Sequence, residues 1–166
     1  MAKNLARGGC PAVGKKDINV TSAFGSAVLM PLVAGLEAMR WSLRAFRGSD
    51  VPPLVAGAAR EATAITAVTL GVRRPLLGFL VTGLAFRLAA WLAPKLAPFD
   101  LEAYLKHHFS KVGEQTRLLF AEYAESAAKR GLASDALSSL LARADTERER
   151  ERGASSITAR EAQGSP

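Results

Sequence analysis

The sequence predicts an all-α fold with a single compact multi-helix domain. Of the 166 residues, 49% are hydrophobic and 22% are charged, so the chain can bury a core. Ala and Leu are abundant and only 7% of residues are aromatic, a mixture that favours helices because Ala and Leu lose little entropy there. No segment shows the sustained alternation of polar and apolar residues that a half-buried strand requires.

The chain divides into three parts by composition. Residues 1–18 are polar, basic and rich in glycine, and we expect a flexible segment there. Residues 19–144 carry the helical patterns and form the predicted domain. Residues 145–166 are polar without apolar anchors, and we expect a disordered tail.

The first helix is expected from Ser22 to Phe46, with Pro31 kinking or dividing it. A second helix, rich in Ala and Thr, is expected from Pro53 to Leu70, where Gly71 is a stop signal. The apolar stripe of the first helix consists of Phe24, Val28, Leu32, Leu36, Met39 and Leu43.

Three further helices follow. An apolar third helix is expected over residues 76–92, closed by prolines at 94 and 98. Asp100 is a good N-cap for a long fourth helix that reaches Lys129 and ends at Gly131. Ser134 is expected to cap a short fifth helix that contains Leu137, Leu140 and Leu141.

Cysteine content and the N-terminus limit the compartment. The single cysteine, Cys10, excludes an internal disulfide and a thiolate metal cluster, and we expect no metal site. The opening MAKNLARGGC lacks the apolar core of a secretory signal, which favours a cytoplasmic protein. The net charge of +7 invites a nucleic-acid interpretation, but the basic residues are scattered without interleaved aromatic residues. We therefore expect a basic surface and no nucleic-acid partner.

The run from Gly9 to Lys16 approaches a phosphate-binding loop. Lys16 occupies the place of the hydroxyl residue, and no strand precedes the run, so a flexible basic tail is favoured over a nucleotide site. The predicted helix over 76–92 is near the lower limit of a membrane span, but Arg87 inside it favours a soluble core helix. Contact with a membrane is therefore not expected, although a span remains the alternative.

Arg40, Arg44 and Arg47 recur at intervals of four and three, which places them on one face of the predicted first helix. Their guanidinium groups suit a phosphate or carboxylate, which makes them candidates for anion binding. The alternative, which we favour, is that they offset the dipole at the C-terminal end of a helix.

The fourth helix carries the most informative pattern. Tyr104, His108, Lys111 and Gln115 are spaced by four, three and four residues, so a continuous helix would align them along one half-buried edge. A histidine, a lysine and an amide can bind an anion or assist proton transfer. The alternative is an ordinary polar boundary between core and solvent.

The segment PFDLEAYLKHHFSKVGEQTR, residues 98–117, resembles the C-terminal segment of a branch of the ketopantoate reductase (2-dehydropantoate 2-reductase) family. The runs MPLVAGLEA and REATAITAVTLGVRRP agree in outline, and RGLASDALSSLLARA fits the closing helix of that family. The resemblance covers about residues 22–143. It implies a helical domain like the C-terminal domain of 6-phosphogluconate dehydrogenase.

The resemblance implies one domain of an NADPH-dependent 2-oxo acid reductase of pantothenate biosynthesis. Such enzymes place a dinucleotide-binding domain before the helical domain, which completes the substrate cleft and mediates dimerisation. Under this resemblance Glu102, Tyr104, His108, Lys111 and Gln115 are candidates for the cleft. The chain contains no G-x-G-x-x-G after a strand, so it binds no cofactor alone by this interpretation.

In that family a lysine on the first helix of the C-terminal domain polarises the keto group and acts in proton transfer. The aligned part of this chain, from Ser22 to Glu37, has no lysine. Two hypotheses follow. In the first, the chain acts as a homodimer or with a separate dinucleotide-binding domain that supplies NADPH, and takes a small 2-oxo acid. In the second, it is a stand-alone helical interaction or membrane-associated protein without catalysis. A helical domain separated from its partner should expose an apolar face.

Overall fold

The computed structural model describes residues 18–75, 78, 80–109, 111 and 113–163, with side chains as far as Ala154. Every regular element of substantial length in this part of the chain is a helix, which confirms the predicted all-α class. The order is α2 (Ile18–Ala38), α3 (Leu43–Gly48), α4 (Val51–Leu70), α5 (Gly83–Leu96), α6 (Leu101–Phe109), α7 (Gly113–Arg130) and α8 (Asp135–Gln163). The predicted flexible segment and the run from Gly9 to Lys16 lie outside the described residues, apart from Ile18.

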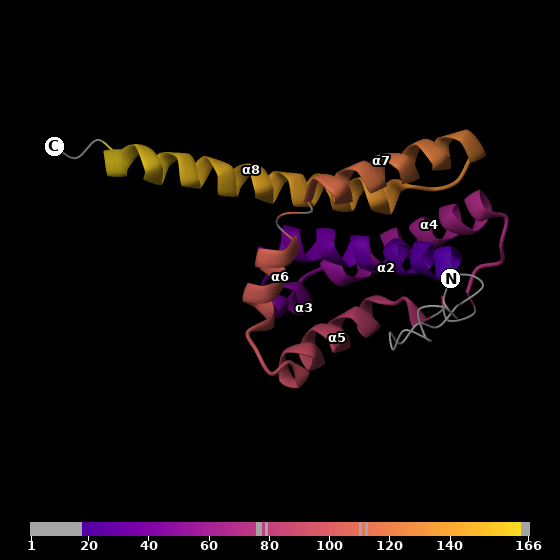
Figure 1. The fold of residues 1–166 in the computed structure, drawn as a ribbon, viewed down its shortest axis with the longest axis horizontal. Coiled ribbons are helices and arrows are strands. Elements are labelled where there is room, and N and C mark those ends of the chain that lie inside the picture. Colours follow the sequence, from indigo (N-terminus) through magenta and orange to yellow (C-terminus); the bar gives the residue numbers. More distant parts are fainter. Residues whose placement is uncertain (1–17, 76–77, 79, 110, 112, 164–166) are drawn as a thin grey trace, which may run out of the picture.

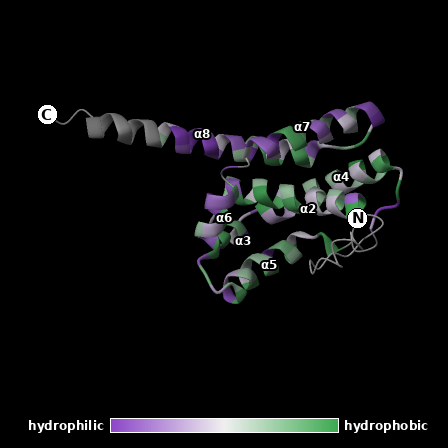
Figure 2. Cartoon of the chain, in the orientation of Figure 1, coloured by the Kyte–Doolittle hydropathy of each residue, from purple (hydrophilic) through white to green (hydrophobic). Residues whose placement is uncertain are grey.

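The helices stack in layers around one hydrophobic core (Figure 1). Helices α2 and α4 form the middle layer, α7 and α8 cover one side, and α5 covers the other, with α3 and α6 at one end. Figure 2 shows hydrophobic residues concentrated on α2 and α4 and hydrophilic residues along α8. The small residues of α4, among them Ala58, Ala59 and Ala62, are fully buried, as the Ala-rich composition of that segment predicts.

The predicted first helix is two helices, and the break does not lie at Pro31. Pro31 is buried inside α2, which ends at Ala38, and α3 begins at Leu43. The chain turns at Arg40 and Trp41, whose φ angles of 52° and 65° lie in the left-handed region. The indole of Trp41 is buried, and its backbone N–H donates to the Leu36 carbonyl at 2.7 Å, so packing and hydrogen bonding offset the strain.

Helix α4 agrees with the prediction, and Gly71 ends it at a φ of 64°, a conformation that suits glycine. The third helix is shifted, because α5 begins at Gly83 rather than at residue 76. Thr82 caps α5 by accepting from the Ala85 N–H at 3.1 Å. Pro94 lies inside the last turn of α5 and does not end the helix.

The prediction of one continuous fourth helix is wrong, because residues 101–130 form two helices, α6 and α7. The predicted ends are confirmed: Asp100 accepts from the Ala103 N–H at 3.0 Å, and Gly131 has a φ of 63°. The break lets the two halves pack in different places. Phe109 of α6 stacks on Trp41, with ring centroids 6.4 Å apart, whereas Phe120 of α7 enters the core.

Helix α8 is much longer than the predicted fifth helix, and it does not stop at Asp145 where a disordered tail was expected. The charged residues after position 144 find partners on other elements. Asp145 accepts from Arg117 Nε at 2.6 Å, and Glu147 accepts from Arg40 Nε at 2.9 Å. Paired charges of this kind favour helix where composition alone predicts disorder.

The start of α8 is capped from another helix. Both oxygens of Glu61, on α4, accept backbone N–H groups, from Ala136 at 3.1 Å and from Leu137 at 2.9 Å. A carboxylate at this place satisfies two free amides and complements the positive end of the helix dipole. Glu61 therefore ties α8 to the middle layer.

We expect Glu61→Ala to lower the free energy of unfolding by about 1–2 kcal/mol, the usual cost of losing a helix cap. Urea unfolding followed by circular dichroism measures this change. The matched control is Glu122→Ala, at an exposed position of α7, which should change the free energy by less than about 0.5 kcal/mol. Equal effects of the two substitutions would contradict the capping role.

Candidate functional site

Among the residues predicted for a cleft, Glu102 has a structural contact. Its Oε1 accepts from the backbone N–H of Leu43 at 2.7 Å, at the first residue of α3. The carboxylate of α6 therefore satisfies a free amide at the start of another helix. This contact holds α6 against α3 and engages one of the two oxygens that a cleft residue would offer a substrate.

Tyr104 and His108 lie one turn apart on α6 and form a row of aromatic rings. Their rings stack with centroids 5.6 Å apart, and Phe99 lies against Tyr104 at 5.3 Å. The His108 ring also meets the edge of Phe109 at 4.9 Å. Tyr104 and His108 are exposed, so the row presents a phenol and an imidazole to solvent at the outer side of α6.

The structure does not join Lys111 and Gln115 to that row as one helix would. Lys111 follows α6, and its Nζ lies 3.2 Å from Nε2 of His107, not from His108. Gln115 lies exposed on α7, beyond the break. The predicted single edge of four residues is therefore wrong, because its spacing assumed an uninterrupted helix.

The three candidate arginines for anion binding do not share one helix face either. Arg40 lies in the turn after α2, whereas Arg44 and Arg47 lie on α3. Arg40 is also committed to Glu147, and its hydrogen bond holds the pKa of that carboxyl below its usual range. Only Arg44 and Arg47 keep the predicted spacing of one turn.

Helix α5 presents an unusually apolar exposed surface. Between Arg87 and Lys95 it carries no acidic residue, and Lys95 Nζ lies 3.5 Å from the centroid of the Trp91 ring. Beside it, an apolar hollow of about 250 Å³ is bordered by α2, α5 and α6. We call the exposed large side chains of this helix the α5 face; they are Leu84, Leu88, Trp91, Leu92 and Leu96.

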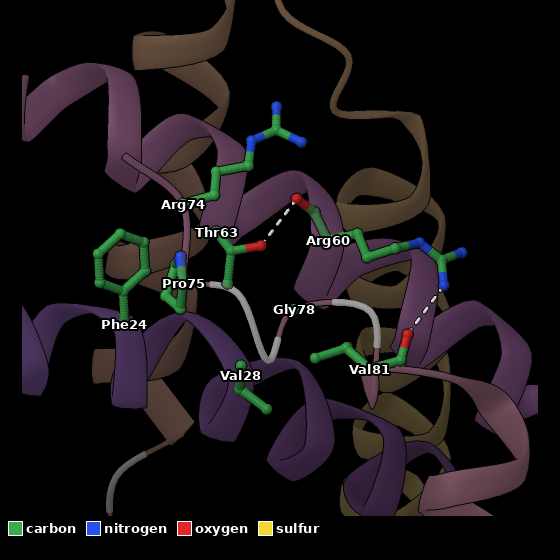
Figure 3. Close-up of a pocket in the computed structure, with 8 residues that line it drawn as sticks. All are labelled: Phe24, Val28, Arg60, Thr63, Arg74, Pro75, Gly78 and Val81. Atoms are coloured by element: carbon green, nitrogen blue, oxygen red, sulfur yellow. Dashed lines mark hydrogen bonds between the residues drawn. The ribbon is translucent and has the colours of Figure 1, made fainter. Parts of the chain in front are cut away.

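A larger hollow, of about 450 Å³, is lined by Phe24 and Val28 of α2, toward the N-terminal end of that helix (Figure 3). It was not predicted from the sequence, because its walls come from three separate segments. Arg60 and Thr63 lie one turn apart on α4, and Arg74 follows that helix. The sequence signal that could have indicated this hollow was an arginine within a predicted helix, followed by a basic turn after that helix. The lining residues are Phe24, Val28, Arg60, Thr63, Arg74, Pro75, Gly78 and Val81.

The described residues contain one helix that is long and apolar enough to cross a membrane, and it is α2. The predicted candidate over 76–92 is not that helix, since α5 has only 14 residues, fewer than the roughly 20 that a span needs. The buried residues of α2 lie mainly in its C-terminal half, and α2 contacts both α4 and α8.

Neither a search for metal-ligand clusters nor comparisons with known proteins identify the site further. Within the part of the chain that the structure describes, no three His, Cys, Asp or Glu side chains gather as a metal site would require. Comparisons with family models, curated proteins and solved structures find no match for this chain. The arrangement therefore offers three features for function: the aromatic row of α6, the α5 face and the hollow beside Arg60.

Proposed function

We propose that this chain is the helical substrate and dimerisation domain of a ketopantoate-reductase-like, NADPH-dependent oxidoreductase in the cytoplasm. The resemblance of residues 98–117 to that family supports the proposal, and so does the all-α architecture. The chain acts as a homodimer or with a separate dinucleotide-binding domain, which supplies NADPH. Alone, it does not reduce a substrate.

The α5 face is the observation that carries this proposal. Five large apolar side chains on one helix of 14 residues remain exposed, among them Leu88 at 55% and Leu96 at 73%. Soluble monomers rarely leave such a surface open, because each exposed apolar group forgoes the free energy of burial. A second chain that covers the α5 face would gain that free energy.

The aromatic row of α6 lies close to this face and gives the proposal its chemistry. Phe99 follows the end of α5 and packs against Tyr104 of α6; both rings are exposed, and α5 and α6 contact each other. His107, His108 and Lys111 add groups that suit the carboxylate of a small 2-oxo acid. In the proposal, a partner seated on the α5 face brings its cofactor to this edge, and the cleft is complete only in the assembly.

The proposal is tested first by the mass of the purified chain in solution, measured by size exclusion with light scattering. We expect a dimer, and we expect Leu88→Glu to raise its dissociation constant by more than about tenfold, because a buried unpaired carboxylate costs several kcal/mol. Leu118→Glu is the matched control, since Leu118 is 66% exposed on α7, on the opposite side of the middle layer. A mass that neither substitution changes would contradict a role of the α5 face in assembly.

Titration with NADPH tests the cofactor part separately. Nicotinamide fluorescence should show no saturable binding by this chain alone, because it lacks a glycine-rich dinucleotide loop after a strand. Saturable binding would overturn the split-domain proposal. In the proposal, the α5 face contacts the dinucleotide-binding domain. When that domain is added to the titration, we expect Leu88→Glu to weaken the binding of NADPH by the assembly.

The second candidate is a stand-alone helical interaction or membrane-associated protein without catalysis. The apolar length of α2 favours it, as does the positive charge of Lys95, whose Nζ lies over the Trp91 ring of the α5 face. Flotation with vesicles that contain anionic lipid separates the two. Binding to vesicles that Leu88→Glu abolishes, together with a monomeric mass, would favour the membrane-associated protein over the reductase domain.

A further inference from the structure

A third hollow, of about 360 Å³, lies between Ser26 of α2, Thr66 of α4 and Tyr123 of α7, and we call it the α7 hollow. Each of its lining residues lies within one of these three helices. Figure 1 shows α7 and α5 on opposite sides of the middle layer, so the α7 hollow is separate from the α5 face. Its volume lies within the range of small-molecule sites.

Two of the polar side chains that line the α7 hollow are buried. Thr66 is 6% exposed and Tyr123 is 8% exposed, and they come from different helices. Burial raises the pKa of the Tyr123 phenol above its ordinary value; a hydrogen bond from the Thr66 side chain opposes this shift, and the charge of Glu122 adds to it. The phenol therefore keeps its proton at neutral pH, so it can both donate and accept a hydrogen bond.

The charges at the border of the α7 hollow balance each other. Glu122 is the one charged side chain in the described lining, and it is exposed. Arg130 lies just outside: its NH1 donates to Oγ of Ser126 at 2.7 Å, and that oxygen lies 3.0 Å from Oγ1 of Thr69. Since the carboxylate and the guanidinium are both exposed to water, which screens them, neither sign of ligand charge is favoured.

Much of the remaining wall is apolar. Ile65 and Leu70 contribute to it from α4, and Leu119 contributes from α7. Leu70 is 44% exposed, so part of this apolar surface is open to solvent, and a ligand that covers it gains the free energy of burial. An apolar wall with a few polar groups that converge on it is the usual composition of a small-molecule site.

We propose that the α7 hollow binds a small uncharged molecule with an apolar body and a hydroxyl group, such as a phenol. The apolar body lies against Ile65, Leu70 and Leu119, and the hydroxyl group forms a hydrogen bond with Tyr123. A carboxylate would lose its hydration beside Glu122 without a cation in the described lining, and a hydrocarbon would gain no hydrogen bond from Tyr123. The site is separate from the proposed 2-oxo acid cleft and does not depend on it.

The test titrates the full chain with three probes that share one ring: para-cresol, para-xylene, in which a methyl group replaces the hydroxyl, and para-toluate. We expect para-cresol to shift the methyl resonances of Ile65, Leu70 and Leu119. Para-toluate should bind at least about tenfold more weakly, because its carboxylate loses hydration. Tyr123→Phe should weaken the binding of para-cresol about threefold to tenfold, the contribution of one hydrogen bond, and that of para-xylene less than about twofold. The matched control is Tyr104→Phe, at the exposed tyrosine of α6, which should change either dissociation constant less than about twofold.

Three outcomes would overturn the proposal. An equal loss of para-cresol and para-xylene binding in Tyr123→Phe would show an effect on packing alone, and equal affinities for para-cresol and para-toluate would show attraction to the net positive charge of the chain. Shifts confined to Leu88 and Leu92 would place the probes on the α5 face. A measurement on the unaltered chain covers the case in which Tyr123→Phe unfolds: the Cζ resonance of Tyr123 should shift further with para-cresol than with para-xylene, and equal shifts would contradict the hydrogen bond.

Discussion

Replacing Leu140 by alanine is expected to lower the free energy of unfolding by about 2–5 kcal/mol, the range for truncating a fully buried leucine. Leu140 is completely buried, and it lies in the first turns of α8 between Leu137 and Ala144, which are also buried. These residues dock α8 against α2 and α4. The cavity left by the missing side chain adds to the lost burial, because close-packed neighbours relax only in part.

Urea unfolding followed by helical circular dichroism measures the loss as a lower midpoint. The matched control is Leu118→Ala, since Leu118 is largely exposed on α7 and should change the free energy by less than about 0.5 kcal/mol. If Leu140→Ala behaves like Leu118→Ala, then α8 does not dock on the middle layer. The long helix would in that case contribute nothing to the core that supports the candidate sites.

A second large effect is expected from Gly35→Ala in α2, which should lower the free energy of unfolding by about 1–3 kcal/mol through overpacking. A Cβ at this position would overlap Cγ2 of Val55 and approach Cε2 of Phe46 to 3.1 Å. Both neighbours are fully buried, so neither can move aside freely. The penalty must exceed the gain that alanine normally brings to a helix.

Gly25→Ala is the matched control in the same helix. No atom lies within 4 Å of a Cβ built at Gly25, so the substitution should stabilise the protein by about 0.5–1 kcal/mol, the helix preference of alanine over glycine. The opposite signs of the two substitutions are the diagnostic result. A stabilising Gly35→Ala would mean that α2 and α4 do not approach as closely as the structure indicates.

Both predictions concern the frame that positions the candidate sites. Arg60 of α4 and Val28 of α2 both line the larger hollow. The break between α2 and α3 buries Trp41, against which Phe109 of α6 stacks. The aromatic row therefore depends on a turn that the apolar pattern of α2 and α3 does not reveal.

Local chemistry was enough to predict several ends of helices. Asp100 caps α6 because a carboxylate beside free amides needs no distant partner. Gly71 and Gly131 end α4 and α7 because only glycine enters the left-handed region without strain. The stacking of Tyr104 on His108 also follows from residues one turn apart on the same helix.

Contacts between distant segments overruled the sequence pattern elsewhere. The spacing from Tyr104 to Gln115 is helical, yet the chain breaks between α6 and α7, where Phe109 and Phe120 pack in different places. The charged run after Ala144 looks disordered until Arg117 and Arg40 are brought to it. These ion pairs form between residues tens of positions apart, and the local spacing of residue types along the chain does not predict them.

From the residues alone come the all-α class and those helix ends whose caps are local, because each depends on groups within a few positions of the chain. The contact of Glu61 with α8, the exposure of the α5 face and the hollow that Arg60 and Arg74 border come from packing. Packing alone settles which side of an apolar helix is covered and which charges meet, since both depend on where the other helices lie.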